Sequence, residues 1–361
     1  MNIAFFGSSL VSAYWNGAAT YSRGLVRGLH DCGHHVTFFE PDAFERQAHR
    51  DMDDPEWAEV VVYAGTGDEG VARALEQARA ADVIVKASGV GVFDGLLEAA
   101  VLDVRRSDAL VLFWDVDAPA TLERVQHDAH DPFRALIPRY DAILTYGGGA
   151  PVVDAYTALG ARRSVPIYNA LDPVTHHPVP ADPRFAADLA FLGNRLPDRE
   201  ARVEEFFLQV AARRLERRFL LGGSGWADKE RPPNVAYAGH VFTRDHNAFN
   251  ASPLAVLNVN RDSMARYGFS PPTRVFEAAG AAACLVTDAW AGIEMFLEPG
   301  REVLVAASGD AVAAHLDALR PEAARASGDR ARARVLAEHT YAHRAAQVSA
   351  LLEARWPAAV A

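Results

Sequence analysis

Short apolar segments that alternate with helical patterns constrain the fold of this chain more than any other feature of its sequence. In the first half they are NIAFFG at 2–7, HVTFFE at 35–40, EVVVYAG at 59–65, DVIVKAS at 82–88, ALVLFWD at 109–115 and AILTYGGG at 142–149. Runs such as LVLF at 110–113 are continuously apolar, which is typical of strands covered on both faces. Repeated strand–helix–strand order therefore predicts a parallel, doubly wound α/β sheet.

The same pattern returns after a proline-rich stretch, VPIYNALDPVTHHPVPADPR, at 165–184. The later apolar segments are DLAFLGN at 188–194, RFLLGG at 218–223, NVAYAG at 234–239, LAVLNVN at 254–260, ACLVTD at 283–288 and EVLVA at 302–306. We therefore predict two Rossmann-like domains. Their bounds are 1–170 for the first, 171–186 for a linker, 187–340 for the second, and 341–361 for a C-terminal helix that could pack on either domain. Ligands of such sheets bind beyond the carboxyl ends of the strands, so we expect the site in a cleft between the domains.

Chain length agrees with this division into two domains, and net charge disfavours several classes of partner. The chain has 361 residues, too many for one ordinary core, and a formal net charge of -11. That charge disfavours nucleic acid and anionic membranes as main partners. The sequence contains neither a long apolar run nor a signal-peptide pattern, and its two cysteines, Cys32 and Cys284, form no disulfide framework. We expect a cytoplasmic protein with a small-molecule ligand; its oligomeric state stays open.

Small residues follow the first predicted strand. Gly7, Ser8 and Ser9 form a turn, and Gly17 precedes the next predicted helix. Such a loop lets a phosphate or an acceptor group approach backbone N–H groups at a helix N-terminus, although a simple tight turn explains it equally well. The GxGxxG pattern of dinucleotide-binding proteins does not occur here.

Carboxylates stand at the end of the strand at 109–115. Asp115 and Asp117 would be costly there unless solvated in a cleft or hydrogen-bonded. Asp117, followed by Ala118 and Pro119, fits a helix N-cap. Asp115 is the candidate catalytic residue, as a general base or as a group that holds sugar hydroxyls.

Further candidates follow strands of the second half. Arg195 and Arg199 suit a diphosphate, because a guanidinium donates two parallel hydrogen bonds, although surface ion pairs are the alternative. Gly223 lies in a flexible turn, and His240 follows the next strand. The adjacent histidines at 34–35 and 176–177 face apart on extended backbone, so we expect no metal site.

The segment SPPTRVFEAAGAAACLVTD at 270–288 carries charged residues at the entrance to a buried unit. Ser270 fits an N-cap and Pro271 the first helical position. Thr273 and Arg274 then lie in the first turn, where the helix dipole favours an anion, and Glu277 shares their face. A carboxylate there can accept both ribose hydroxyls while the first turn holds phosphates, although a surface pair of Arg274 and Glu277 is the simpler explanation.

Several segments together resemble glycosyltransferases of the GT-B fold, in particular the CgeB-like group, which is related to glycosyltransferase families 1 and 4. The block at 270–305 is similar to their donor-binding block, most of all that of the CgeB-like group of spore-coat and polysaccharide enzymes. AFLGNRLPDRE at 190–200 resembles the start of their second domain, VPIYNALDP at 165–173 their linker, and the stretches at 7–25 and 33–42 their N-terminal unit.

The resemblance implies a nucleotide diphosphate sugar held by the second domain and an unknown acceptor held by the first. Glu277 matches the ribose-binding glutamate, Arg195 or Arg199 the basic residue on the diphosphate, and GT-B enzymes generally use neither metal nor cofactor. Related retaining enzymes carry a second glutamate where this chain has Phe269, and often a histidine where it has Asp115. These departures leave retention or inversion, the sugar and the base open.

Other activities fit parts of the pattern. A sugar-nucleotide 2-epimerase shares the two-domain fold and needs no separate acceptor. A nicotinamide-dependent oxidoreductase is disfavoured by the missing GxGxxG, and a non-catalytic nucleotide-sugar-binding protein is favoured by Phe269.

Overall fold

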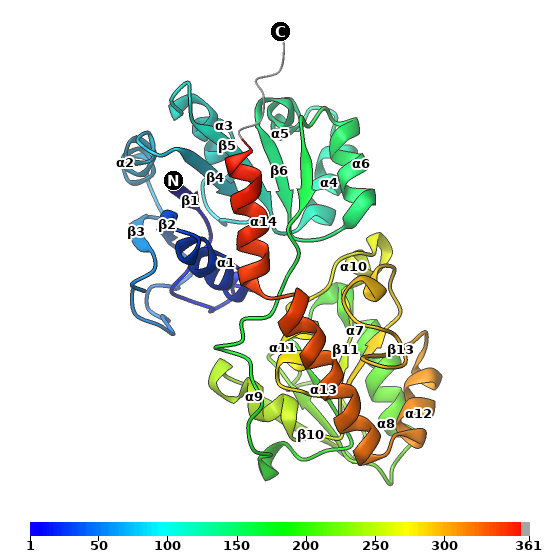
Figure 1. The fold of residues 1–361 in the computed structure, drawn as a ribbon. Helices are drawn as coiled ribbons and strands as arrows, with labels where there is room; N and C mark the ends of the chain where they lie inside the picture. Colours follow the sequence, from blue (N-terminus) through cyan, green and yellow to red (C-terminus); the bar gives the residue numbers. More distant parts are fainter. Residues whose placement is uncertain (355–361) are drawn as a thin grey trace. The chain divides into compact units, whose positions relative to one another are not determined.

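The computed structural model describes residues 1–354 and divides into two compact units. The first consists of residues 1–169 together with the segment from Tyr341 on, and the second runs from Ala170 to Thr340. Each unit is built around one parallel sheet with helices on its faces (Figure 1). The expected fold class, two Rossmann-like parallel-sheet domains, is confirmed.

The sheet of the first unit has the strand order β3-β2-β1-β4-β5-β6-β7. Its strands are β1 (Asn2–Phe6), β2 (His35–Asp42), β3 (Glu59–Ala64), β4 (Val83–Ala87), β5 (Leu110–Asp115), β6 (Ala142–Thr145) and β7 (Ser164–Pro166). Ile3 of β1 pairs in register with Val36 on one side and Val83 on the other. Apolar side chains of the central strands point into both helical layers, as their uninterrupted apolar runs predict.

Helices cover both faces of this sheet. They are α1 (Ala19–Asp31), α2 (Asp68–Ala78), α3 (Asp94–Val104), α4 (Ala118–His127), α5 (Pro132–Leu136), α6 (Gly149–Ala158) and α14 (Tyr341–Glu353), with a short 3₁₀ turn at Ile137–Arg139. The predicted C-terminal helix thus packs as α14 on the first unit. Residues 355–361 of that prediction lie outside the described residues.

Glycines on α1 let α14 pack closely against it (Figure 1). A Cβ atom added to Gly24 would lie 2.1 Å from the ring of Tyr341, and one added to Gly28 would lie 2.7 Å from Cβ of Ala345. Tyr21 of α1 also meets the ring of Tyr341 edge-on, with centroids 5.9 Å apart. Glycine at 24 and 28 therefore sets the distance between the two helices.

The sheet of the second unit has the order β10-β9-β8-β11-β12-β13. Its strands are β8 (Leu189–Leu192), β9 (Phe219–Gly222), β10 (Val235–Gly239), β11 (Ala255–Asn258), β12 (Leu285–Asp288) and β13 (Leu304–Ala306). Each lies within one of the apolar segments from which it was predicted. Buried Phe191, Phe207, Trp226 and Leu257 belong to its core.

The helices of this unit follow its strands. They are α7 (Pro197–Val203), a π-helical turn at Glu204–Leu208, α8 (Gln209–Ala212), α9 (Thr243–Ala251), α10 (Asp262–Tyr267), α11 (Thr273–Gly280), α12 (Gly309–Ala318) and α13 (Pro321–Glu338), with 3₁₀ turns at Pro183–Phe185 and Ile293–Met295. The stretch at 171–186, predicted as a linker, falls within this unit.

The start of α11 corrects one expectation. Pro272 is the N-cap and Thr273 the first helical residue, so Ser270 is not the cap and Pro271 is not in the first turn. Pro271 stands before a second proline, which disfavours the helical conformation for it. The hydroxyl of Ser270 instead donates to the carbonyl of Gly268 at 3.0 Å.

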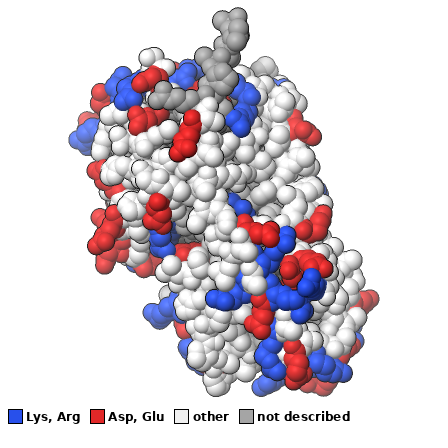
Figure 2. All heavy atoms as spheres, in the orientation of Figure 1, with Lys and Arg blue, Asp and Glu red and all other residues white. Residues whose placement is uncertain are grey.

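Charged side chains of both signs lie close together on the face drawn in Figure 2. In the second unit, Arg213 pairs with Asp310 and Arg214 with Asp317 at 2.7 Å each. None of the helices within residues 1–354 is both long and apolar enough to cross a membrane.

Candidate nucleotide-sugar site

The predicted donor residues all lie in the second unit, in loops that follow its strands, on α7, on α11 or just before α11. Gly223 follows β9 with a φ of +116°, and a Cβ atom there would lie 2.2 Å from the carbonyl oxygen of Gly193. Only glycine fits such a close approach with this backbone. The loop after β8 and the loop after β9 are therefore in direct contact at the carboxyl ends of these strands.

His240, at the end of β10, lies beside this contact. Its Nδ1 lies 3.4 Å from the hydroxyl of Ser224, and its ring meets that of Phe242 edge-on at 4.6 Å. Both His240 and Phe242 are exposed. An exposed imidazole and phenyl ring at a strand end offer a surface on which a planar group can stack.

Arg195 is held by acidic neighbours rather than left for a ligand. Its Nε and Nη2 each donate to Glu200 at 2.7 Å, and Nη1 lies 3.1 Å from Asp228. Hydrogen bonds to Glu200 raise the pKa of Arg195. Of the two predicted diphosphate ligands, Arg195 is therefore the less available.

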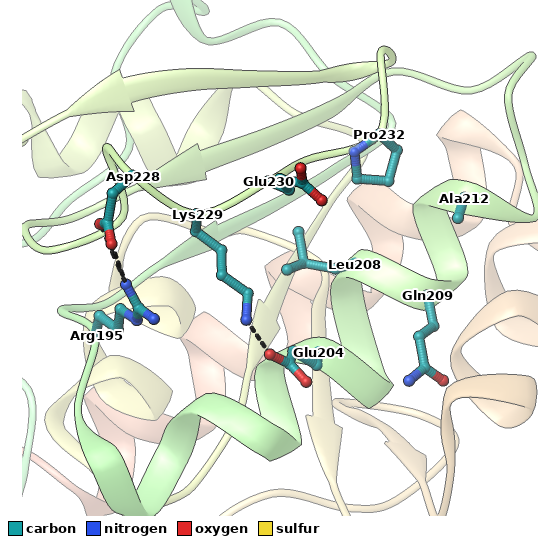
Figure 3. A pocket seen from close by; sticks show the side chains of 9 residues that line it. All are labelled: Arg195, Glu204, Leu208, Gln209, Ala212, Asp228, Lys229, Glu230 and Pro232. Carbon is teal, nitrogen blue, oxygen red and sulfur yellow. Dashed lines mark hydrogen bonds and ion pairs between the residues drawn. The ribbon is translucent and has the colours of Figure 1, made fainter.

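A pocket of about 460 Å³ opens beside Arg195. Figure 3 shows Arg195 directed towards Asp228, and Lys229 towards Glu204. The remaining lining comes from Leu208, Gln209, Ala212, Glu230 and Pro232. The ion pairs that line this pocket connect the π-helical turn and Arg195 to the loop after β9, which suits a structural role. Among the predicted donor residues, only Arg195 lines the pocket.

Arg199 of α7 is placed differently. Its Nε is buried without a hydrogen-bond partner, and burial, followed by the charge of Arg261, lowers the pKa of Arg199. Arg274 is also close enough to lower it, while Asp198 and Asp288 oppose the shift. Arg261 already pairs with Asp198 at 2.7 Å, whereas Nε of Arg199 has no partner, so Arg199 is the guanidinium group here that can bind phosphate oxygens.

On α11, Arg274 and Glu277 form an ion pair with Nη1 3.1 Å from Oε2. Burial would raise the pKa of Glu277, but the Arg274 guanidinium and other neighbours, including the hydroxyl of Thr273, lower it to about 2. The side chain of Glu277 is 8% exposed and that of Arg274 16%. The pair therefore presents a fixed carboxylate and a fixed cation at the first turns of a helix, where the dipole also attracts anions.

Two histidines that sequence reasoning did not connect with Glu277 surround it. His176 comes from the stretch before the 3₁₀ turn at Pro183–Phe185, and His246 comes from α9. Burial lowers the pKa of His176, and it lowers that of His246 to about 4. Gly280 permits this assembly, since a Cβ atom there would lie 2.9 Å from the carbonyl oxygen of His176.

The predicted phosphate or acceptor loop of the first unit is internally bonded. A Cβ atom on Gly7 would lie 2.3 Å from the ring of Phe38, so that glycine is required for packing. Ser8 donates to the side chain of Asn16 at 2.9 Å, and Ser9 to Glu40 at 3.0 Å. Gly17 is exposed, and an added Cβ atom would meet nothing within 4 Å.

Asp115 is fully buried at the end of β5. Its oxygens accept hydrogen bonds from Ser88 at 2.8 Å, Thr121 at 3.0 Å, Tyr156 at 2.5 Å and the backbone N–H of Asp117 at 3.1 Å. Burial raises the pKa of Asp115, and the bond from Tyr156 partly offsets this. A general base must reach a substrate proton, so this geometry favours a structural role.

Comparisons with known proteins point to one fold. Residues 199–350 match the family model described as glycosyl transferase-like. Searching the curated protein sequences gives no match.

Similar solved structures cover nearly the whole chain. Sucrose-phosphate synthase from Thermosynechococcus elongatus has a TM-score of 0.67 and 15% identity over 98% of each chain. HepE from Anabaena, in complex with UDP-glucose, has a TM-score of 0.68 and 14% identity over 98% of this chain and 100% of its own. An alpha-glucosyltransferase in complex with UDP has a TM-score of 0.71 and 10% identity over 98% of this chain and 99% of its own. At such identities the likeness is one of fold: this chain has the GT-B fold of those glycosyltransferases.

Proposed function

We propose that this protein is a glycosyltransferase that moves a sugar from a nucleotide diphosphate sugar to an acceptor hydroxyl. One observation carries the proposal: the guanidinium group of Arg274 pairs with buried Glu277 in the first turns of α11 and is close enough to Arg199 to lower the pKa of that arginine. The Nε atoms of both arginines are buried without a hydrogen-bond partner, which a diphosphate would supply.

Each residue has a distinct task in this proposal. Glu277 accepts the hydrogen bonds of the ribose hydroxyls, and its low pKa keeps it ionised for that purpose. Arg274, Arg199 and the first N–H groups of α11 stabilise the negative charge that develops on the leaving diphosphate. These groups supply the charge compensation, so the transfer itself needs no metal ion.

A uridine diphosphate sugar is the first donor to test. HepE and the alpha-glucosyltransferase were solved with UDP-glucose and with UDP, and both share the fold of this chain. We also propose that the protein belongs with the CgeB-like group, which its block at 270–305 resembles, and that it transfers a hexose.

The acceptor is assigned to the first unit, where the loop of Gly7, Ser8, Ser9 and Gly17 follows β1. A catalytic role for Asp115 stays a prediction against which its burial argues. Without an accessible carboxylate at 115, the stereochemical outcome of the transfer stays open.

A second function is favoured by a specific observation. Phe269, in the position of the second glutamate of retaining enzymes, has a left-handed backbone with a φ of +48° and packs its ring where a Cβ atom on Gly292 would lie. Together with the buried Asp115, this suits a protein that binds a nucleotide sugar without transferring it.

Two measurements separate these functions. Thermal shifts with UDP, GDP, TDP and CDP, and with their sugars, identify the nucleotide. Release of UDP from UDP-glucose is then followed with a panel of acceptor sugars. Stabilisation together with acceptor-dependent release supports the transferase, and stabilisation without release supports the binding protein. Conversion of the donor alone to its 2-epimer indicates an epimerase, and the absence of any shift contradicts a nucleotide site.

A further inference from the structure

His176, His246 and Glu277 bring three metal-ligating groups together inside the second unit. Each offers one nitrogen or oxygen atom, and these atoms all lie within 4.8 Å of one another. The residues come from three separate segments: the stretch before the 3₁₀ turn at Pro183–Phe185, α9 and α11. Asn247 of α9 ties two of these segments together, because its side chain donates to the carbonyl of Thr175 at 2.9 Å.

The hydrogen bond of His246 fixes which of its nitrogens can bind an ion. Its Nε2 lies 3.2 Å from the carbonyl oxygen of Val241. A carbonyl only accepts, so Nε2 carries the proton and Nδ1 keeps its lone pair. Nδ1 is buried without a hydrogen-bond partner. Metal-binding histidines commonly donate the proton of their second nitrogen to a carbonyl in this way.

His176 is 2% exposed, and neither of its ring nitrogens has a hydrogen-bond partner. Burying such a polar group without a partner costs roughly 1–3 kcal/mol. Its Nε2 lies 4.0 Å from Oε1 of Glu277, which is too far for a hydrogen bond. The ring is therefore aimed at the carboxylate without bonding to it.

The two oxygens of Glu277 have different surroundings. Oε2 faces Nη1 of Arg274 at 3.1 Å, and Oε1 faces His176. The ion pair with Arg274 thus occupies Oε2 and leaves Oε1 free to act as a monodentate ligand.

We propose that His176, His246 and Glu277 bind a divalent transition-metal ion, with zinc as the best fit. Two imidazoles and one carboxylate form a common zinc set that leaves a fourth position open. Zinc bonds of about 2.0–2.2 Å place ligand atoms about 3.3 Å apart, so the three side chains close inward by about 1 Å on binding. Calcium and magnesium are disfavoured, because they prefer oxygen ligands.

A consequence concerns the nucleotide, and this part rests on the proposed function. Glu277 cannot hold a metal ion on Oε1 and also accept both ribose hydroxyls. Zinc and the nucleotide therefore exclude one another, and the metal acts as an inhibitor rather than as part of the transfer.

The test uses the full chain without a histidine tag. Zn²⁺ is titrated calorimetrically into the wild type and into His176→Ala, His246→Ala and Glu277→Gln. His177→Ala is the control, because it removes an exposed imidazole next to the site. We expect one ion per wild-type and per control chain, and affinity at least about 10-fold weaker in the three site variants. Circular dichroism checks that each variant is folded, and the isosteric Glu277→Gln decides the matter if a histidine variant is not.

Failure of the wild type to bind, or equal binding by a folded site variant, overturns the metal site. A second titration is made in the presence of UDP, with Zn²⁺ titrated into UDP alone to correct for chelation by phosphate. Weaker zinc binding in UDP supports the exclusion, and unchanged zinc binding to UDP-saturated protein contradicts it. If UDP does not bind at all, the proposed function fails while the first titration still decides the metal site.

Discussion

Nη1 of Arg274 lies 3.1 Å from Oε2 of Glu277, one turn further along α11. The carboxylate holds the guanidinium at the N-terminal end of the helix, and the guanidinium keeps the carboxylate ionised. Neither group is fixed without the other, so under the proposed function each should have a measurable share in nucleotide binding.

Arg274→Ala is expected to weaken UDP binding about 10- to 100-fold, because hydrogen bonds to charged groups contribute about 1.5–3 kcal/mol. The loss for uridine, which lacks phosphates, should be smaller. Calorimetric titration with both ligands measures the difference, and Arg325→Ala on the exposed face of α13 is the control. Equal losses for UDP and uridine would show that Arg274 acts only through Glu277.

Glu277→Gln is expected to reduce binding of UDP and uridine alike, because the amide loses the charge that accepts the ribose hydroxyls. Thermal shifts measured at matched ligand concentrations give the comparison. Glu322→Gln is the control, since its carboxylate is exposed on α13. A full UDP shift in Glu277→Gln would remove that residue from the site.

Asp115→Ala is expected to destabilise the protein by about 3 kcal/mol or more, since each buried group left without a partner costs about 1–3 kcal/mol. Ser88, Thr121 and Tyr156 all lose an acceptor. Urea unfolding measures the change, with Asp154→Ala on the exposed face of α6 as the control. A variant that is as stable as the wild type but inactive would instead favour the catalytic role.

Stability should fall in acid through Glu200. Hydrogen bonds from Arg195 and then Lys229 lower its pKa from 4.5 to about 2. A carboxyl group whose pKa is lowered by folding stabilises the fold at any pH above its pKa in the unfolded chain. This contribution to stability is lost as the pH falls from about 4.5 towards 2. Urea unfolding of wild type and Glu200→Gln should therefore differ at neutral pH and converge in acid. A difference that does not change with pH would contradict the assignment.

Gly24→Ala is expected to destabilise the first unit by about 1–3 kcal/mol, the usual cost of forcing extra atoms into a packed contact. The new methyl group would meet the ring of Tyr341. Gly95→Ala on α3 is the matched control, because its Cβ atom meets nothing within 4 Å and alanine favours a helix. Equal stability of the two variants would mean that α14 does not pack on Gly24.

The strands were predictable because strands that are buried on both faces consist of apolar residues in succession, and the central strands show this pattern. β7 was not predicted, because it is a three-residue edge strand that ends in a proline. The start of α11 was predicted too early, because Ser270 followed by a proline matches the signature of a helix N-cap. Pro272 disfavours the helical conformation for Pro271, so the helix begins only at Thr273.

The candidate site was predictable only in part. Thr273, Arg274 and Glu277 are neighbours along one helix, so spacing alone brings them together. His176 and His246 reach Glu277 from segments far apart in sequence, and no periodicity links them. Nothing in the sequence favoured either Arg195 or Arg199 as the diphosphate ligand. In the structure, Glu200 and Asp228 form ion pairs with Arg195, whereas burial lowers the pKa of Arg199.

The return of the chain to its first sheet through α14 sets the order in which the protein can mature on the ribosome. All strands of that sheet are synthesised before the second unit, but the partner for Gly24 and Gly28 arrives only with residues 341–353. Until then α1 lacks the helix that packs on Gly24 and Gly28, so the first unit gains this contact only after the whole second unit has been synthesised.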